Sequence, residues 1–259
     1  MRSSIIDFEQ VSFSYPKTSE LVIDELSFSI TEGEFVCFIA PSGTGKSTLF
    51  RLMTSLESPI SGTISFRNQP IAEGMKKIGY MPQRDLLLEW RTILDNAALP
   101  LELQGINKKK ARKMASSYLE EFQLHQHSHK YPHQLSGGMR QRVSFLRAML
   151  SGKDLLLLDE PFSALDAMTR MTMHEWLLQM WKKWKLTIIF VTHDIDEALL
   201  LADRVFIFSK KPLSSYNQCV IKEPRPRQIK NELFEWKQQI VQQLTEAPPI
   251  HSLVKEKLF

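Results

Sequence analysis

The stretch that decides the fold runs from Phe35 to Met53 and reads FVCFIAPSGTGKSTLFRLM. It begins with a continuous apolar run, residues 35–40, of the kind that forms a strand buried on both faces of a sheet. A turn containing Gly43 and Gly45 follows, and apolar residues then recur at helical spacing over 49–53. The sequence therefore predicts a strand, a glycine-containing loop and a helix in direct succession.

The loop between this strand and this helix has the residue types that hold a phosphate group. Its glycines let backbone N–H groups approach closely, and the start of a helix favours negative charge. Lys46 would reach the β- and γ-phosphates of a nucleotide, and Ser47 would bind Mg²⁺. The usual motif begins with glycine, whereas this chain has Ala40, whose methyl group is compatible with a negative φ. The candidate nucleotide-binding residues are Ala40, Pro41, Ser42, Gly43, Thr44, Gly45, Lys46, Ser47 and Thr48.

A second apolar run, Leu155–Leu158, ends in two acidic residues, Asp159 and Glu160. This pattern places the two residues at the carboxyl edge of a parallel sheet, where ligands bind. Neighbouring strand residues point to opposite faces, so the two carboxylates can take different roles. Asp159 would hold Mg²⁺, directly or through water, and Glu160 would orient or deprotonate an attacking water. The alternative is a strand-end turn with solvated acids.

The rest of the chain alternates between strand-like and helical patterns, which indicates an α/β fold with a parallel sheet. Near the N-terminus, Phe13, Tyr15, Leu26, Phe28 and Ile30 alternate with polar residues as in half-buried strands. Further strands are predicted at 76–81, 187–191 and 205–208, and helices at 107–122, 138–150 and 229–244.

These patterns predict two parts of the chain. Residues 1–215 would form the sheet domain, with an N-terminal antiparallel β subdomain and an inserted helical subdomain at about 86–150. Residues 216–259 would add a strand and an amphipathic helix packed on or beside the core, within a proline-containing tail that includes Pro248 and Pro249.

Composition agrees with a globular protein. The 259 residues are 43% hydrophobic and 24% charged. The net charge of +4 suits an anionic ligand such as a nucleotide, a surface of acidic lipid or nucleic acid, or is simply a solvated basic surface. Two cysteines, Cys37 and Cys219, form no disulfide framework and suit a reducing compartment. No secretory signal and no apolar run of roughly 18 residues is found, so a membrane role would require a membrane partner.

A third motif, residues 135–142, reads LSGGMRQR. Ser136, Gly137 and Gly138 form a second helix start with exposed amides, although an ordinary capped helix would look the same. Together with the phosphate-binding loop and the Asp159-Glu160 pair, this motif closely resembles the ABC ATPase family, and the resemblance covers nearly the whole chain.

The resemblance implies roles for four further residues. Gln83 matches the glutamine that senses Mg²⁺ and faces the membrane partner. His193 matches the switch histidine that contacts the γ-phosphate, and Tyr15 matches the aromatic residue that stacks on adenine. Asp166 ends the segment 163–166, which matches the D-loop of the family.

The resemblance also implies partners and location. Two copies would pair head to tail, with the phosphate-binding loop of one facing Ser136 and Gly138 of the other across ATP and Mg²⁺. The pair would power transmembrane permease subunits at the cytoplasmic face of the membrane, served indirectly by an external solute-binding protein, and no nucleic acid is expected.

Residues 83–105 and 223–227 are similar to the nitrate, sulfonate, taurine and thiamine-precursor importer branch, although Glu89 stands where that branch usually has proline. One alternative is an ABC ATPase acting on nucleic acid or ribosomes without a permease, which usually has two nucleotide domains or a long coiled-coil insert. Another is a non-hydrolytic regulatory subunit, which is opposed by the intact Lys46, Asp159, Glu160 and His193.

Overall fold

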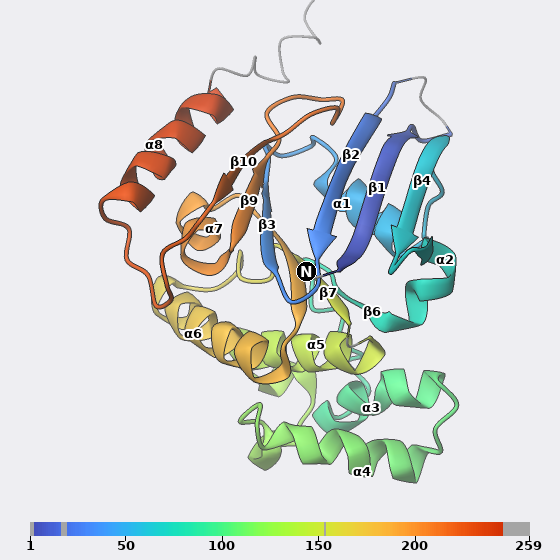
Figure 1. Cartoon of the computed structure of the whole chain (residues 1–259). Helices are drawn as coiled ribbons and strands as arrows, with labels where there is room; N and C mark the ends of the chain where they lie inside the picture. The colour runs from blue at the N-terminus through green and yellow to red at the C-terminus, as the bar shows by residue number, and fades with distance from the viewer. Residues whose placement is uncertain (1–2, 17–19, 153, 246–259) are drawn as a thin grey trace, which may run out of the picture.

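A computed structural model describes residues 3–16, 20–152 and 154–245 of the chain, and shows two sheets with helices around them (Figure 1). The larger sheet has the strand order β10-β9-β3-β8-β7-β6. All of its strands run parallel except β10, which pairs antiparallel with β9 at one edge. Its strands are β3 (Phe35–Ile39), β6 (Ile78–Met81), β7 (Leu155–Asp159), β8 (Thr187–Thr192), β9 (Arg204–Ile207) and β10 (Asn217–Val220).

The smaller sheet is antiparallel and has the order β2-β1-β4-β5. Its strands are β1 (Ser4–Phe13), β2 (Ile23–Thr31), β4 (Ser61–Phe66) and β5 (Gln69–Pro70). The predicted α/β fold with an N-terminal antiparallel β subdomain is therefore confirmed.

The helices follow the chain order α1 to α8. They are α1 (Lys46–Met53), α2 (Ile71–Gly74), α3 (Ile93–Leu103), α4 (Lys108–Leu119), α5 (Gly137–Ser151), α6 (Ala167–Trp184), α7 (Ile195–Leu201) and α8 (Glu232–Thr245), with 3-10 turns at Met75–Lys77, His125–His127 and Pro132–Gln134. Figure 1 shows α3 and α4 together at one end of the molecule, beyond α5.

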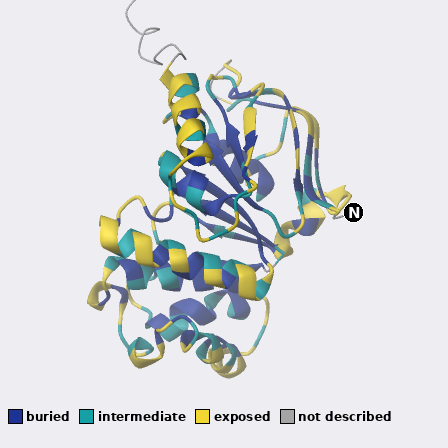
Figure 2. Ribbon diagram, turned by 60° about the vertical axis from the view of Figure 1, so that its left-hand side comes forward, coloured by how far each residue is buried: buried dark blue, intermediate teal, exposed yellow. Residues whose placement is uncertain are grey.

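The alternation along each central strand divides the core into two layers. In β7, Leu155 and Leu157 pack towards the antiparallel sheet and α1, whereas Leu156 and Leu158 pack towards α5 and α6. Both faces of the strand are thereby buried, as its uninterrupted apolar sequence predicts. Figure 2 shows these strands as a dark blue, buried layer inside the fold.

Short polar side chains start several of these helices. Thr92, Asn107, Ser136, Asp166 and Asp194 each accept a hydrogen bond from a backbone N–H in the first turn of the helix that follows. These side chains satisfy amides that have no partner within the helix. The helix starts at 93, 108, 137, 167 and 195 are therefore fixed locally by sequence.

Two strand predictions need correction. Tyr15 lies beyond the end of β1, which pairs from Ser4 to Phe13, because the chain leaves the sheet after Phe13. The segment predicted as a strand over 76–81 begins as a 3-10 turn, and only Ile78–Met81 joins the sheet, beside β7.

The C-terminal segment returns to the sheet domain. Leu233 and Ile240 of α8 are buried in the larger core cluster, and Figure 1 places α8 outside α7. Arg225 donates two hydrogen bonds to the carbonyl oxygen of Leu201, the last residue of α7, and pairs with Asp203 at 2.9 Å. The division of the chain near residue 215 stays a prediction, and Pro248 and Pro249 lie outside the described residues.

Candidate active site

The loop predicted to bind phosphate joins β3 to α1 at the carboxyl end of the parallel sheet. Gly43 has a φ of 80° and Gly45 a φ of 116°, values that L-residues with a side chain rarely adopt. A Cβ atom on Gly45 would also lie 2.6 Å from Cγ1 of Val22. Ala40 is not among the described residues with positive φ, so its methyl group is accommodated without strain. The departure from the usual first glycine therefore leaves the loop geometry intact.

Lys46, the first residue of α1, is buried against this loop. Its Nζ donates to the carbonyl oxygens of Ala40 at 2.8 Å and Pro41 at 3.0 Å. Burial lowers the pKa of Lys46, while the nearby carboxylates of Glu160 and Asp159 act in the opposite direction. The ammonium group of Lys46 is therefore held close to two carboxylates in a place with little access to water.

Asp159, at the end of β7, lies next to the start of α1. Its Oδ2 accepts a hydrogen bond from Ser47 Oγ at 3.0 Å and another from the hydroxyl of Tyr80 at 3.4 Å. Burial raises the pKa of Asp159, and the Ser47 hydrogen bond opposes that effect. A magnesium ion prefers oxygen ligands and is held in such sites by one or two carboxylates plus substrate phosphates. The hydroxyl of Ser47 and the carboxylate of Asp159 fit that requirement.

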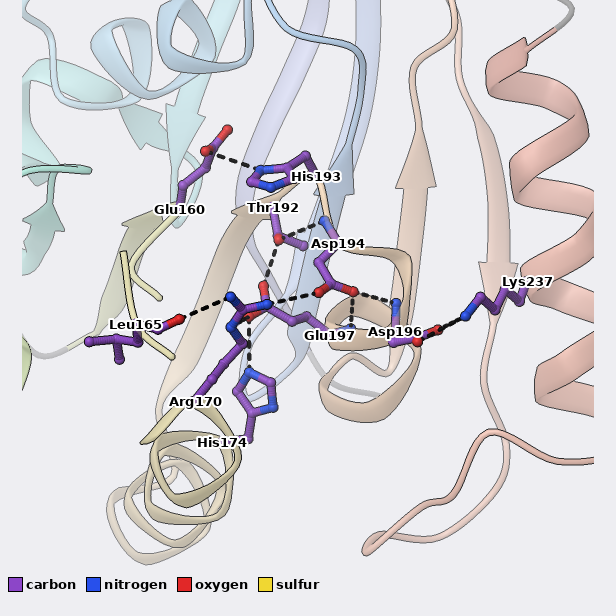
Figure 3. Close-up of polar contacts among 10 residues, drawn as sticks. All are labelled: Glu160, Leu165, Arg170, His174, Thr192, His193, Asp194, Asp196, Glu197 and Lys237. Atoms are coloured by element: carbon purple, nitrogen blue, oxygen red, sulfur yellow. Dashed lines mark hydrogen bonds and ion pairs between the residues drawn. The ribbon is translucent and has the colours of Figure 1, made fainter. Parts of the chain in front are cut away.

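Glu160 follows directly and has a φ of 45°, in the left-handed region that residues with a side chain rarely adopt. Its Oε2 accepts from Nε2 of Gln83 at 3.2 Å and lies 3.2 Å from Nδ1 of His193 (Figure 3). Three residues from three separate strand ends, β6, β7 and β8, therefore meet at one carboxylate oxygen. The sequence predicted these residues individually, and the structure brings them together.

A cleft of about 510 Å³ lies over these groups. Tyr15 stands at its side, with its hydroxyl 3.0 Å from Oγ1 of Thr48. Three lining residues, Glu20, Val22 and Lys211, were not predicted from the sequence, because no local motif marks them. The cleft is lined by Tyr15, Glu20, Val22, Ser42, Gly43, Gly45, Lys46, Ser47, Thr48, Gln83, Glu160 and Lys211.

Neither the Ser136–Gly138 motif nor Asp166 lines this cleft. Instead these segments lie beside each other, since a Cβ on Gly138 would be 2.9 Å from Cγ2 of Thr169. Asp166 is exposed and accepts from the backbone and hydroxyl of Thr169, which lowers the pKa of Asp166. The structure therefore separates the predicted site residues into two groups on one chain.

Helix α5 connects the second group to the segment after Gln83. Arg147 donates to the carbonyl oxygens of Asp85 and Leu86, and Ser144 donates to the same Asp85 oxygen at 3.2 Å. Arg140 donates to the Asp85 carboxylate at 3.1 Å. Asp85 and Leu86, which follow Gln83, are therefore held by hydrogen bonds to α5, the helix that begins after Ser136.

A glycine-containing loop from a buried strand to a helix, with two acids at the end of a second strand of the same parallel sheet, defines a nucleoside triphosphatase of the phosphate-binding-loop class. The sequence profile of the ABC transporter family matches residues 23–163. This chain belongs to that family, as an ATP-binding subunit whose ATP hydrolysis is coupled to transport.

Curated relatives cover most of the chain. A formylaminopyrimidine import ATP-binding protein of Halalkalibacterium halodurans is 52% identical over 85% of this chain and 86% of that protein. A nitrate import ATP-binding protein of Synechocystis sp. is 37% identical over 92% of this chain and 90% of its own length. An aliphatic sulfonates import ATP-binding protein of Bacillus cereus is 39% identical, over 89% and 91%.

A solved dimeric bacterial ABC transporter cassette superimposes with a TM-score of 0.73 at 28% identity, covering 85% of this chain and 100% of that chain. The same score, at 27% identity, is found for a dimeric ATP-binding cassette in a post-hydrolysis state bound to ADP and Pi. Within the described residues, no helix combines the length and the apolarity that crossing a bilayer requires.

Proposed function

We propose that the chain binds Mg·ATP in the cleft of residues 40–48 and hydrolyses it to power import of a small solute through a membrane permease. The convergence of Gln83 and His193 on Glu160 is the observation that carries this proposal. A carboxylate in that position can accept a proton from an attacking water, and its two neighbours fix its orientation.

The remaining residues would divide the work of binding. Backbone amides of the loop and Lys46 would hold the phosphates, and Tyr15 would support the adenine ring. Ser47, Asp159 and Gln83 would hold Mg²⁺, which neutralises charge on the phosphate oxygens. His193 would place its imidazole at the γ-phosphate, beside Glu160.

The position of the Ser136–Gly138 motif and Asp166 outside the cleft supports a dimer. The first turn of α5, which starts after the exposed cap Ser136, is outside the cleft of its own chain. A helix start of this kind attracts anions. Two copies arranged head to tail would bring each motif to the cleft of the other copy, and similar cassettes have been solved as dimers.

The solute class rests on the relatives. Three of them are named as import proteins for formylaminopyrimidine, nitrate or aliphatic sulfonates. We propose that this chain serves an importer of the same branch, with a pyrimidine precursor of thiamine as the first solute to test. The subunit would then sit on permease subunits at the cytoplasmic face, with an external solute-binding protein delivering the solute.

The Glu160→Gln variant tests the hydrolytic assignment. We expect it to bind Mg·ATP, lose at least about 100-fold in turnover and accumulate as an ATP-dependent dimer in size-exclusion chromatography with light scattering. Glu73→Gln, at an exposed position in α2, is the control and should behave as wild type. Wild-type turnover in Glu160→Gln would refute the role of Glu160.

A second experiment tests the transport assignment. The full chain, coexpressed with a candidate importer permease from the same genome, should copurify with that permease and with no nucleic acid. Stable copurification with ribosomes instead would favour the alternative ATPase without a permease.

A further inference from the structure

Helix α6 begins with Asp166 as its cap, and its first turn faces the start of α7 (Figure 3). Arg170 lies at the end of that turn. Its Nη2 donates to the carbonyl oxygen of Leu165 at 3.1 Å, and its Nη1 donates to Oδ2 of Asp194 at 3.2 Å. One guanidinium therefore joins the residue before Asp166 to the residue after His193.

The backbone on both sides of His193 is held in the same region. Thr192 Oγ1 donates to Oε2 of Glu197 at 2.6 Å and accepts from the backbone N–H of Asp194 at 3.0 Å. Asp194 Oδ1 accepts from the first-turn amides of α7 while its Oδ2 faces Arg170. His193 itself projects from this anchored segment to Glu160.

The part of these contacts that involves Glu197 is buried. The side chain of Glu197 is 6% exposed and that of His174, 3.0 Å from it, is 12% exposed. Arg170 supplies a positive charge beside Glu197 as well, with Nε 3.9 Å from Oε1. Hydrogen bonds to charged groups in such partly buried places are about twice as strong as neutral ones.

We propose that Arg170 is a positioning residue for ATP hydrolysis, which ties the segment 163–166 to the segment that carries His193. This inference rests on the proposed function of both segments. When Asp166 of one copy meets a second copy, the position of Leu165 sets the position of Asp194, and through it the distance of His193 from Glu160. Contact between the two copies would in this way alter the geometry of the hydrolytic site.

The forked shape of arginine is what the bridge requires. A guanidinium presents several N–H donors in a rigid plane, and here two of its nitrogens serve two acceptors at once. Lysine carries the same charge, but its three N–H donors share one nitrogen, which cannot take the places of both Nη1 and Nη2. The Arg170→Lys variant therefore keeps the charge and breaks the bridge.

Arg204 provides a matched control on β9. It also donates to a backbone carbonyl, that of Ser29 at 2.8 Å, and to a carboxylate, that of Glu34 at 2.9 Å. It is 19% exposed, compared with 30% for Arg170, and it does not line the cleft. Both contacts are made by Nη2 of Arg204, and neither reaches the segments that Arg170 joins, so Arg204→Lys controls for the change of side chain itself.

The experiment measures kcat and KM for Mg·ATP with the purified full-length chain. For Arg170→Lys we expect kcat to fall about tenfold or more, with KM unchanged, because bound ATP would meet a misplaced His193. Arg204→Lys should keep the wild-type kcat. Equal kcat values in the two variants, or a rise in KM alone for Arg170→Lys, would overturn the proposal.

A double-mutant cycle with Asp194→Asn tests the bridge itself. Asparagine is as good a helix cap as aspartate, so α7 should still start correctly. We expect the two single variants to lower kcat and the double variant to lower it no further, since they break the same contact. Effects that multiply would show two independent contacts and refute the bridge.

His193→Ala separates this inference from the proposed function. If His193→Ala retains wild-type kcat, the proposed role of His193 fails. If His193→Ala is inactive while Arg170→Lys matches Arg204→Lys, only the positioning role of Arg170 fails.

Discussion

Ser47 donates a hydrogen bond to Oδ2 of Asp159 at 3.0 Å, although 112 residues of sequence separate them. The contact also passes over a strand, because β8 lies between β3 and β7 in the sheet. It is possible because β3 and β7 run parallel, so that the segments after these two strands leave the sheet at the same edge. Two oxygen donors suited to one cation are thereby placed side by side by sheet topology.

Lys46→Ala should weaken binding of Mg·ATP by about 100-fold, because a buried cation that faces the phosphates is lost. Isothermal titration calorimetry with the full chain measures this affinity. Lys211→Ala is the matched control, since Lys211 lines the same cleft but pairs at 3.5 Å with Glu20, which is well exposed. We expect a much smaller change there, and wild-type affinity in Lys46→Ala would contradict the phosphate-binding assignment.

Tyr80→Phe should lower the free energy of unfolding by about 1 kcal/mol at pH 7, because the hydroxyl that donates to Asp159 is removed. The difference from wild type should shrink at alkaline pH. Burial, with Asp159 adding to the effect, raises the pKa of Tyr80 from 10.0 to about 12.

The sign follows from proton binding. Between pH 10 and 12 the folded protein keeps a proton that the unfolded chain has lost, so wild-type stability falls as pH rises through this window. Below that window Tyr80 contributes no pH dependence. Denaturation by urea at several pH values checks this, with Tyr131→Phe as an exposed control. A constant difference between Tyr80→Phe and wild type from pH 8 to pH 12 would contradict it.

Gly79→Ala should destabilise the fold by about 2–3 kcal/mol. Gly79 is in β6 where α5 passes close by, and a Cβ there would lie 2.2 Å from the backbone oxygen of Ala148. Gly105→Ala is the comparison, since Gly105 has a φ of 85° but open space around it. Backbone strain alone should cost about 1 kcal/mol there. Equal losses in guanidinium unfolding would rule out close packing as the reason for Gly79.

Arg225→Gln should destabilise the chain by about 1–3 kcal/mol, because the Leu201 carbonyl loses its charged donor at the end of α7. The guanidinium of Arg225 also lies over Trp181, 4.5 Å from the ring centre. Arg67→Gln breaks a more exposed pair with Glu32 and should change stability by no more than about 0.5 kcal/mol. Thermal unfolding of both variants gives the comparison, and similar melting temperatures would show that Arg225 adds little.

The sequence predicted those parts of the site that consist of consecutive residues in a recognisable motif. The loop 40–48 and the pair Asp159-Glu160 each follow a continuous apolar strand, so local pattern gave both their type and their place. The capping residues Asn107 and Ser136 likewise marked helix starts that the structure confirms. The roles of the individual site residues stay predictions.

Other features depend on contacts between distant segments and leave no local trace. The bridge from Arg170 to Leu165 and Asp194 exists only because α6 and α7 meet, and the hydroxyl of Tyr80 finds Asp159 only because β6 pairs with β7. For Tyr15 the local pattern predicted too much. Its alternation with Phe13 suggested a strand residue, but the last residue of β1 that pairs is Phe13.

The attachment of Asp85 and Leu86 to Arg147 has a mechanical consequence. Arg147 lies eleven residues beyond Ser136 on one continuous helix, which spans roughly 16 Å between them. Arg140 and Ser144 also contact Asp85, so the segment after Gln83 is held along much of this helix. A displacement of the segment after Gln83 would therefore carry the whole helix with it as a rigid body, including the first turn that Ser136 caps.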